Sequence, residues 1–291
     1  MSWGTITKIG FVTIETSNLD ATLDTACGIL GLREAKRLGG TAYLAAAAVH
    51  HEIIYRAGDR NAVSHISLEA RDPDSIVQIR RRVIDAGLRI RSELPLEDGV
   101  SEALSFVGPD GFVFEVYTGL AKLTHSQPTF GPDRYGHVNL HPTDAIRMRN
   151  FLVDILDFRV SDAIGSTAFF LRCNADHHGI ALIEGRGALH HHAWQTQSIA
   201  DLGKLADRLD QSGRTLLWGP VRHGAGQNIA VYFEEPTGCV VELYCDLEQI
   251  YDDGRPAVEW SPNNPKWFNR WSDWRPADFR QFGVPPASDP A

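Results

Sequence analysis

The sequence predicts an α+β protein with two homologous halves of two βαβββ modules each, followed by a C-terminal tail rich in tryptophan and proline. The chain has 291 residues, which suits two domains that are each large enough to bury a core. The segment that begins at Gly10 aligns without a gap with the segment that begins at Gly136. Beyond this repeat lie four of the seven tryptophans: Trp260, Trp267, Trp271 and Trp274.

Each half begins with an alternating strand and a helix, as in GFVTIETSNLDATLDTACGILGL and GHVNLHPTDAIRMRNFLVDILDF. Asp144 is a suitable N-cap for the second of these helices. Short strands follow in VHHEIIYRAG and DHHGIALIEG. A second module then starts at a strand containing His65 or His191, continues in a helix, and closes with GPDGFVFEVY or EPTGCVVELY. The order of elements therefore occurs four times, which predicts four βαβββ modules.

The repeat also predicts the domain boundaries. We expect a first domain over residues 1–119, a second over 132–247, and a tail over 248–291, because the joint at 120–131 has turn residues and little periodicity. A segment rich in tryptophan is costly to leave in water. The tail is therefore expected to be either a strap on the second domain or a neighbouring subunit, or a lid over an apolar pocket.

Charge and cysteine content limit the partners and the compartment. The formal net charge is -9, which disfavours binding to nucleic acid or to an anionic membrane surface. No apolar run approaches the roughly 18 residues of a membrane span, and the first residues lack a signal-peptide core. The four cysteines form no CxxC pair. A cytoplasmic protein is the expectation.

Three strands of the second half carry groups that bind metals. Strand alternation places His137, Asn139 and His141 on one face, and it places His191 on the face opposite to His190 and His192. Glu242 stands in the apolar strand CVVELY, where an unpaired carboxylate is costly. Two histidines and one carboxylate are the facial triad of non-haem Fe(II) oxygenases, and zinc hydrolases use the same set. We interpret His141 and His190 as satisfied structural residues.

The first half offers an internal control. His65 and Glu115 stand at the positions of His191 and Glu242, but Phe11 replaces the third ligand. Leu96 and Ser105 likewise stand where the second half has His223 and Tyr232. One metal site per chain, in the second domain, is therefore expected.

Several motifs in order resemble the type I extradiol catecholic dioxygenases of the vicinal oxygen chelate superfamily, which also holds glyoxalases and bleomycin resistance proteins. They are the GHVNL strand, the HH pair 13 residues before His191, the loop and strand GPVRHGAGQNIAVYF, and the closing EPTGCVVELY. The resemblance covers residues 5–247 and is densest between 136 and 244. It implies the vicinal oxygen chelate fold and ring cleavage of a catechol beside its two hydroxyls by dioxygen.

The resemblance also implies roles for individual residues. His137, His191 and Glu242 would bind Fe(II), or Mn(II) as in some members, and His178 would be the acid–base histidine. His177, its neighbour in sequence, is interpreted as a packing residue turned away from it. The other residues that match the catalytic machinery or the substrate and oxygen pocket are His223, Tyr232, Asn139, Phe170 and Trp218.

The sequence specifies the substrate and the oligomeric state less closely than it specifies the fold and the metal ligands. Some relatives that take carboxylated catechols have an arginine where this chain has Trp218, and the tail is rich in tryptophan, so we expect an uncharged or hydrophobically substituted catechol. Two alternatives remain: a redox-neutral member of the superfamily (isomerase, lyase or thiol transferase) and a protein that only binds an aromatic compound. A homo-oligomer is expected, as is common in the family.

Overall fold

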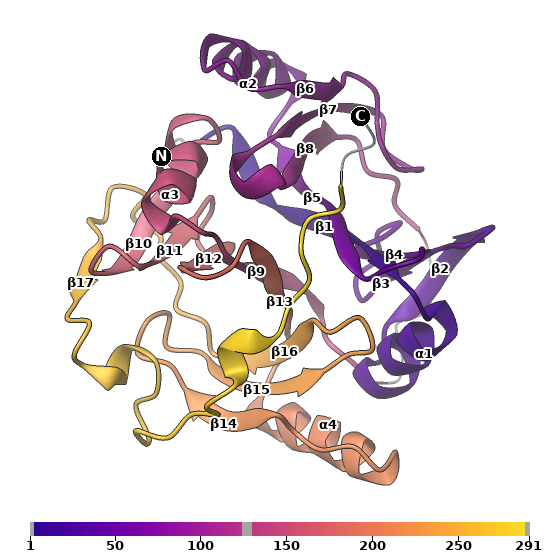
Figure 1. The fold of residues 1–291 in the computed structure, drawn as a ribbon, viewed down its shortest axis with the longest axis vertical. Helices are drawn as coiled ribbons and strands as arrows, with labels where there is room; N and C mark the ends of the chain where they lie inside the picture. The colour runs from indigo at the N-terminus through magenta and orange to yellow at the C-terminus, as the bar shows by residue number, and fades with distance from the viewer. Residues whose placement is uncertain (1–2, 124–129, 289–291) are drawn as a thin grey trace.

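The computed structural model describes residues 3–123 and 130–288, and within them each half of the chain forms one β-sheet (Figure 1). The predicted joint at 120–131 lies partly outside the described residues, as do both ends of the chain. The first half contains β1 (Ile6–Thr16), α1 (Leu19–Leu23), a π-helical turn η1 (Asp24–Leu30), β2 (Arg33–Leu38), β3 (Thr41–Ala45), β4 (Ile53–Ala57), β5 (Ala62–Ala70), α2 (Pro73–Asp85), β6 (Ile90–Ser92), β7 (Glu102–Val107), a 3₁₀ turn η2 (Pro109–Gly111) and β8 (Val113–Thr118).

The second half repeats this order of elements. It contains β9 (Arg134–His141), α3 (Ala145–Asp154), β10 (Arg159–Ile164), β11 (Ala168–Arg172), β12 (Ile180–Ile183), β13 (Ala188–Gln195), α4 (Ile199–Gln211), β14 (Trp218–Arg222), β15 (Ile229–Glu234) and β16 (Val240–Cys245). The tail adds β17 (Val258–Trp260) and two 3₁₀ turns, η3 (Pro265–Trp267) and η4 (Phe279–Gln281).

Strand pairing defines the modules. The first sheet has the order β2-β3-β4-β1-β5-β8-β7-β6, and the second has the order β14-β15-β16-β13-β9-β12-β11-β10-β17. In each module the first strand pairs in parallel with the last: β1 with β4, β5 with β8, β9 with β12, and β13 with β16. The two modules of a half meet through antiparallel pairs, β1 with β5 and β9 with β13. The predicted α+β fold of βαβββ modules is confirmed.

The helices begin where their capping residues stand. The side chain of Asp144 accepts a hydrogen bond from the backbone N–H of Arg147 at 2.8 Å, which makes it the N-cap of α3 as predicted. Asp72 caps α2 in the same way through Ser75. Helix α4 buries Leu202, Leu205 and Leu209, a spacing that places one apolar face on the core.

One glycine is required at the same place in both halves. A Cβ on Gly10 would lie 2.1 Å from the hydroxyl oxygen of Tyr117, and a Cβ on Gly136 would lie 2.1 Å from that of Tyr244. Each tyrosine ring therefore packs directly on the backbone of the first strand of its half. In both halves the tyrosine of the last strand thus reaches across the intervening strand, β5 or β13, to the glycine of the first strand.

The tail crosses the second half and returns to the first (Figure 1). Strand β17 pairs in parallel with β10 at the sheet edge. Further along, Val284 bridges to Leu189 of β13, and Pro286 bridges to Val63 of β5. The halves also meet through the Tyr55 hydroxyl, which donates a hydrogen bond to Glu235 at 2.7 Å. In the described ranges no helix has the length and apolar character that crossing a membrane requires.

Candidate metal centre and active site

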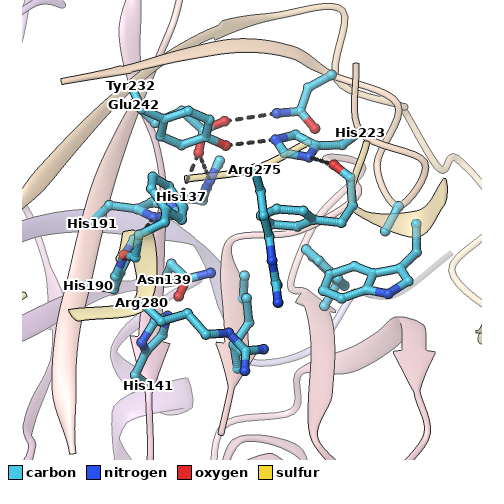
Figure 2. A pocket seen from close by; sticks show the side chains of 18 of the residues that line it. His137, Asn139, His141, His190, His191, His223, Tyr232, Glu242, Arg275 and Arg280 are labelled. Carbon is cyan, nitrogen blue, oxygen red and sulfur yellow. Dashed lines mark hydrogen bonds and ion pairs between the residues drawn. The ribbon is translucent and has the colours of Figure 1, made fainter. Parts of the chain in front are cut away.

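The three predicted metal ligands lie on three neighbouring strands, β9, β13 and β16. The Nε2 atoms of His137 and His191 lie 3.2 and 3.1 Å from the same carboxylate oxygen, Oε2 of Glu242. The three ligand atoms all lie within 4.8 Å of one another. Figure 2 shows these side chains converging on one wall of a cavity. The structure thus brings together residues separated by more than a hundred positions in sequence.

A hydrogen-bond chain from the tail sets the hydrogen positions on His191. The carbonyl oxygen of Phe279 lies 2.6 Å from Nε2 of His190, and a carbonyl only accepts, so this nitrogen carries hydrogen. Burial is the main cause that lowers the pKa of His190 well below its usual value, and His191 and His141 lower it further. The ring is therefore neutral, and its Nδ1 has a lone pair. Nδ1 of His191, 2.8 Å away, must then donate.

This assignment leaves a lone pair on Nε2 of His191, facing a carboxylate oxygen. Burial lowers the pKa of His191 to about 4, so no second proton is present near neutral pH. Two electron-rich atoms 3.1 Å apart in a buried site need a cation between them. Ligands about 2.1 Å from a metal ion and at right angles are about 3 Å apart. The donor set therefore fits a divalent metal.

Charge and packing around Glu242 agree with this reading. Burial opposes the charged form of Glu242, and His137 and His191 hold the pKa of the carboxyl well below its usual value when they carry hydrogen toward it. With a lone pair there instead, a metal cation would stabilise the charged carboxylate in their place. Its second oxygen, Oε1, accepts a hydrogen bond from Asn228 Nδ2 at 2.9 Å. The carboxylate is thus oriented by one amide and presents Oε2 to the two histidines.

The predicted orientation of His190 was wrong. In β13, Leu189 pairs with Leu140 and His191 pairs with Asn139, so His190 is an extra residue at a β-bulge. A bulge interrupts strict alternation, and His190 consequently lines the same cavity as His191. Its ring stacks on that of His141, with centroids 4.3 Å apart and planes at 17°. Both histidines that we interpreted as structural belong to the cavity wall.

His178 lies on another wall of the cavity, against the first ligand. Its ring centroid is 4.3 Å from that of His137, and burial lowers its pKa well below the usual value. Nδ1 of His177 lies 3.0 Å from Nδ1 of His178, so His177 is a packing neighbour that also contacts it. Nε2 of His177 faces Asp162 at 3.0 Å, an ion-pair contact rather than an aligned hydrogen bond. Asp162 favours the hydrogen on Nε2 of His177, which leaves a lone pair on Nδ1 of His177. Nδ1 of His178 then donates to that lone pair, so the lone pair of His178 is on Nε2, toward the cavity.

A second hydrogen-bond chain from the tail orients Tyr232. The carbonyl oxygen of Phe268 lies 2.6 Å from Nδ1 of His223, so this nitrogen carries hydrogen. Burial lowers the pKa of His223. The neutral ring therefore accepts at Nε2 from the Tyr232 hydroxyl, 2.7 Å away. Burial and the nearby Glu242 raise the pKa of Tyr232 well above its usual value, which keeps the phenol protonated.

The remaining predicted pocket residues divide into two groups. Asn139 and Phe170 line the cavity, and the Phe170 ring lies 5.1 Å from that of His178. The structure does not bring Trp218 to the cavity wall. Its indole lies one layer behind, stacked between Tyr232 and Phe268 at centroid distances of 5.2 and 4.6 Å. Trp218 supports the tyrosine from behind.

The sequence left open whether the tail covers a pocket, and it did not indicate which tail residues line this cavity. The tail helps to close a cavity of about 70 Å³. Its wall includes residues from the tail: Trp267, Phe268, Arg275, Pro276, Ala277, Phe279 and Arg280. The tail has no periodicity that would predict this placement. For His141 a signal existed, because alternation put it on the face of His137.

The corresponding place in the first half is satisfied by protein groups alone. Glu115 accepts hydrogen bonds from the Ser67 hydroxyl at 2.7 Å and the Leu96 N–H at 2.8 Å. Phe11 is fully buried and packs against the His65 ring at 6.0 Å between centroids. Both oxygens of Glu115 thus accept hydrogen bonds from groups that only donate there, whereas Oε2 of Glu242 faces two histidine nitrogens.

Comparison with known proteins supports this description. Residues 134–243 match the family model for the Glyoxalase/Bleomycin resistance protein/Dioxygenase superfamily. The solved structure of the Mn(II)-bound glyoxalase from Novosphingobium aromaticivorans is 30% identical, covers 92% of this chain and 91% of its own, and superposes with a TM-score of 0.86. The chain belongs to this superfamily, as the resemblance predicted.

Two curated relatives are named as ring-cleaving enzymes. The manganese-dependent 2,3-dihydroxybiphenyl 1,2-dioxygenase of Geobacillus genomosp. 3 is 26% identical over 88% of this chain and 90% of its own length. The iron-dependent extradiol dioxygenase of Rhodococcus jostii (strain RHA1) is 23% identical over 87% of this chain and 94% of its own. Relatives of this chain thus include both iron-dependent and manganese-dependent dioxygenases.

Proposed function

We propose that the protein is an extradiol dioxygenase that opens the ring of a catecholic compound with dioxygen, in the degradation of aromatic compounds. The observation that carries the proposal is the joint placement of His178, His223 and Tyr232 around a cluster of two histidines and one glutamate, inside one cavity. The relatives named as extradiol dioxygenases support the same reaction class.

The metal in the proposal is Fe(II), with Mn(II) as the alternative that one relative uses. His137, His191 and Glu242 would hold it. When bound, such a metal supplies a redox-active Lewis acid with open positions for the two catechol oxygens and for dioxygen. The second domain carries this site, and the first domain serves as a scaffold without one.

The side chains around the metal site would transfer protons and orient the substrate. His178 is neutral, and its Nε2 lone pair faces the cavity, so it can take a proton from a catechol hydroxyl and return it to an oxygen later. Tyr232 donates its hydrogen to His223, which leaves phenol oxygen lone pairs to accept from the substrate. Phe170 lies against His178, and Asn139 lines the same cavity, so both restrict what can enter beside the substrate.

The overall reaction balances without another reductant. One ring carbon–carbon bond beside the diol breaks, and both atoms of dioxygen enter the product, whose atoms are therefore those of one catechol and one dioxygen molecule together. The catechol itself supplies the four electrons that reduce dioxygen. The product is a semialdehyde or ketone of a muconic acid.

A redox-neutral reaction is the second candidate, because the solved relative from Novosphingobium is named a glyoxalase. Such chemistry needs the metal as a Lewis acid but has no role for the combination of His178, His223 and Tyr232. A protein that only binds aromatic compounds would not need the ligand cluster at all. The arrangement of the cavity therefore favours the dioxygenase.

The decisive experiment couples metal analysis to oxygen consumption. The purified protein, loaded anaerobically with Fe(II) or Mn(II), is mixed with a panel of catechols, and we expect one dioxygen consumed per catechol with a yellow product. His191→Ala should abolish metal retention and uptake, whereas His65→Ala, at the same place in the first half, should retain both. Metal-loaded protein that consumes no dioxygen with any catechol would refute the proposal.

Two further properties belong to the proposal. The four cysteines are all free, which supports a reducing cytoplasm as the compartment. Trp271 and Trp274 keep 54% and 62% of their surface exposed, and large exposed indoles support a contact with another copy of the chain. Sedimentation of the purified protein tests the expected homo-oligomer.

A further inference from the structure

Two arginines of the tail line the cavity, and neither forms an ion pair with a carboxylate in the described ranges 3–123 and 130–288. The Arg275 guanidinium lies 5.7 Å from the Phe268 ring centroid. Arg280 also lines the cavity. Figure 2 shows both side chains in the same space, with their guanidinium ends on the side of His141. Both remain solvent-exposed, which places them at the mouth.

This end of the cavity is electrostatically positive, although the chain as a whole carries a charge of -9. Arg280 keeps part of its surface in water, and its partial burial in the cavity wall, together with the neighbouring Arg275, lowers the pKa of its guanidinium. Burial, His191, Arg280 and Arg186 lower the pKa of His141 to about 3. No carboxylate offsets this cluster among the described residues that line the cavity other than Glu242, which lies in the ligand cluster.

The two ends of the cavity are therefore suited to bind different parts of one ligand. The cluster of His137, His191 and Glu242 would receive the two catechol oxygens. The aromatic side chains of Phe170 and Phe279 also line the cavity. The guanidinium groups stand on the His141 side, where a ring substituent would project, and a planar guanidinium pairs most strongly with a carboxylate.

We infer that Arg275 and Arg280 form a subsite for an anionic substituent, and that the preferred substrate is a catechol bearing a carboxylate side chain. This inference rests on the proposed function and specifies its substrate class. It replaces the uncharged catechol expected from the sequence, because Trp218, which suggested an apolar pocket, lies behind Tyr232 rather than in the wall.

Matched substrates test the charge requirement directly. Steady-state kcat/KM is measured for catechols of similar size with a carboxylate, a neutral or an ammonium side chain: 3,4-dihydroxyphenylacetate, 4-ethylcatechol and 3,4-dihydroxyphenethylamine, together with the corresponding 2,3-dihydroxyphenyl series. We expect the carboxylate to exceed the neutral compound by about tenfold or more in at least one series. This preference should shrink as salt is added, because the guanidinium groups are exposed. A preference for the neutral compound in both series would overturn the inference.

Variants separate recognition from structure. Arg275→Gln and Arg280→Gln should each lower kcat/KM for the carboxylate by about tenfold while leaving the neutral catechol within twofold. Arg280→Glu should reverse the order, so that the ammonium compound is preferred. Arg270→Gln is the matched control, because Arg270 is an exposed arginine of the same tail outside the cavity wall. An equal loss with all three substrates would mean that the arginines only hold the tail, and would overturn the inference.

An anaerobic binding measurement keeps the two proposals distinguishable. Without dioxygen, calorimetry on the Mn(II)-loaded protein should show tighter binding of the carboxylated catechol than of the neutral one, and this difference should disappear in Arg275→Gln/Arg280→Gln. Charge-selective binding without oxygen uptake would retain the subsite and refute the dioxygenase. Oxygen uptake without charge selectivity would retain the dioxygenase and refute the subsite.

Discussion

Replacing His190 with phenylalanine tests whether the hydrogen bonds that link the tail to His191 through His190 affect the metal affinity of the site. The wild-type ring links Phe279 C=O, at 2.6 Å, to Nδ1 of His191, at 2.8 Å. Phenylalanine keeps the ring volume and the stack on His141 but makes neither hydrogen bond. His191 is then free to place its hydrogen on Nε2, toward Glu242, where it competes with a metal.

The expected loss of metal affinity follows from the partner that disappears. When a metal takes Nε2 in the variant, the buried Nδ1–H of His191 has no acceptor, which costs about 1–3 kcal/mol. At about 1.4 kcal/mol per tenfold change, this corresponds to roughly 5- to 140-fold weaker binding. The assay is a titration with Mn(II), in which free Mn(II) is measured by electron paramagnetic resonance.

Two companion variants make the result interpretable. His190→Asn can still donate to Phe279 and accept from His191, so it should restore much of the affinity. His50→Phe alters another adjacent histidine pair, the one in the first half that aligns with His177 and His178. There Nδ1 of His50 lies 2.7 Å from Nδ1 of His51 with no ligand cluster, so this variant should leave metal binding unchanged. A folded His190→Phe protein with wild-type Mn(II) affinity would refute the reasoning, as would an asparagine variant as weak as phenylalanine.

Four other outcomes are expected. Glu242→Gln removes the buried charge that faces both histidines and should weaken Mn(II) binding by at least about 100-fold, measured as metal content after dialysis; full metal retention would contradict the ligand assignment. Tyr232→Phe removes the hydroxyl that bonds His223 and should lower kcat/KM for oxygen uptake by about 100-fold with unchanged metal content. Burial lowers the pKa of His51 to about 3, below the unfolded value of about 6.5, so its stabilising effect is complete above pH 6.5 and is lost as pH falls toward 3. Urea unfolding of the metal-free protein between pH 6 and 4 should therefore lose about 1.4 kcal/mol per pH unit from this histidine, and His51→Gln should reduce the slope accordingly. Tyr55→Phe removes the hydrogen bond to Glu235 between the halves and should cost about 1.5–3 kcal/mol in urea unfolding, whereas Tyr251→Phe, at an exposed site, should cost nothing measurable.

The sequence predicted those parts of the site that depend on local periodicity and on the duplication. His137 and Asn139 face the same way because strand residues alternate, and Glu242 is conspicuous because a carboxylate rarely stands among apolar strand residues. The repeat supplied His65 and Glu115 as references, which identified the equivalent strands. Since equivalent modules pair their strands in the same way, the alignment of two halves predicts which strands become neighbours.

Features that depend on pairing partners or on long-range packing were accessible only in the structure. Whether His190 faces the cavity depends on a bulge, and a bulge is defined by the register of β13 against β9 rather than by either strand alone. The stack that withdraws Trp218 from the cavity depends on Phe268 arriving from the tail.

By itself, then, the sequence determined the modular fold, the ligand cluster and the half that carries it, because these follow from side-chain period and internal repetition. The tertiary structure alone decided that the tail closes the cavity, supplies the carbonyls that orient His190 and His223, and places Arg275 and Arg280 at its mouth. A chain segment without periodicity has its position decided by the surfaces it packs against, and those surfaces exist only once both halves have folded.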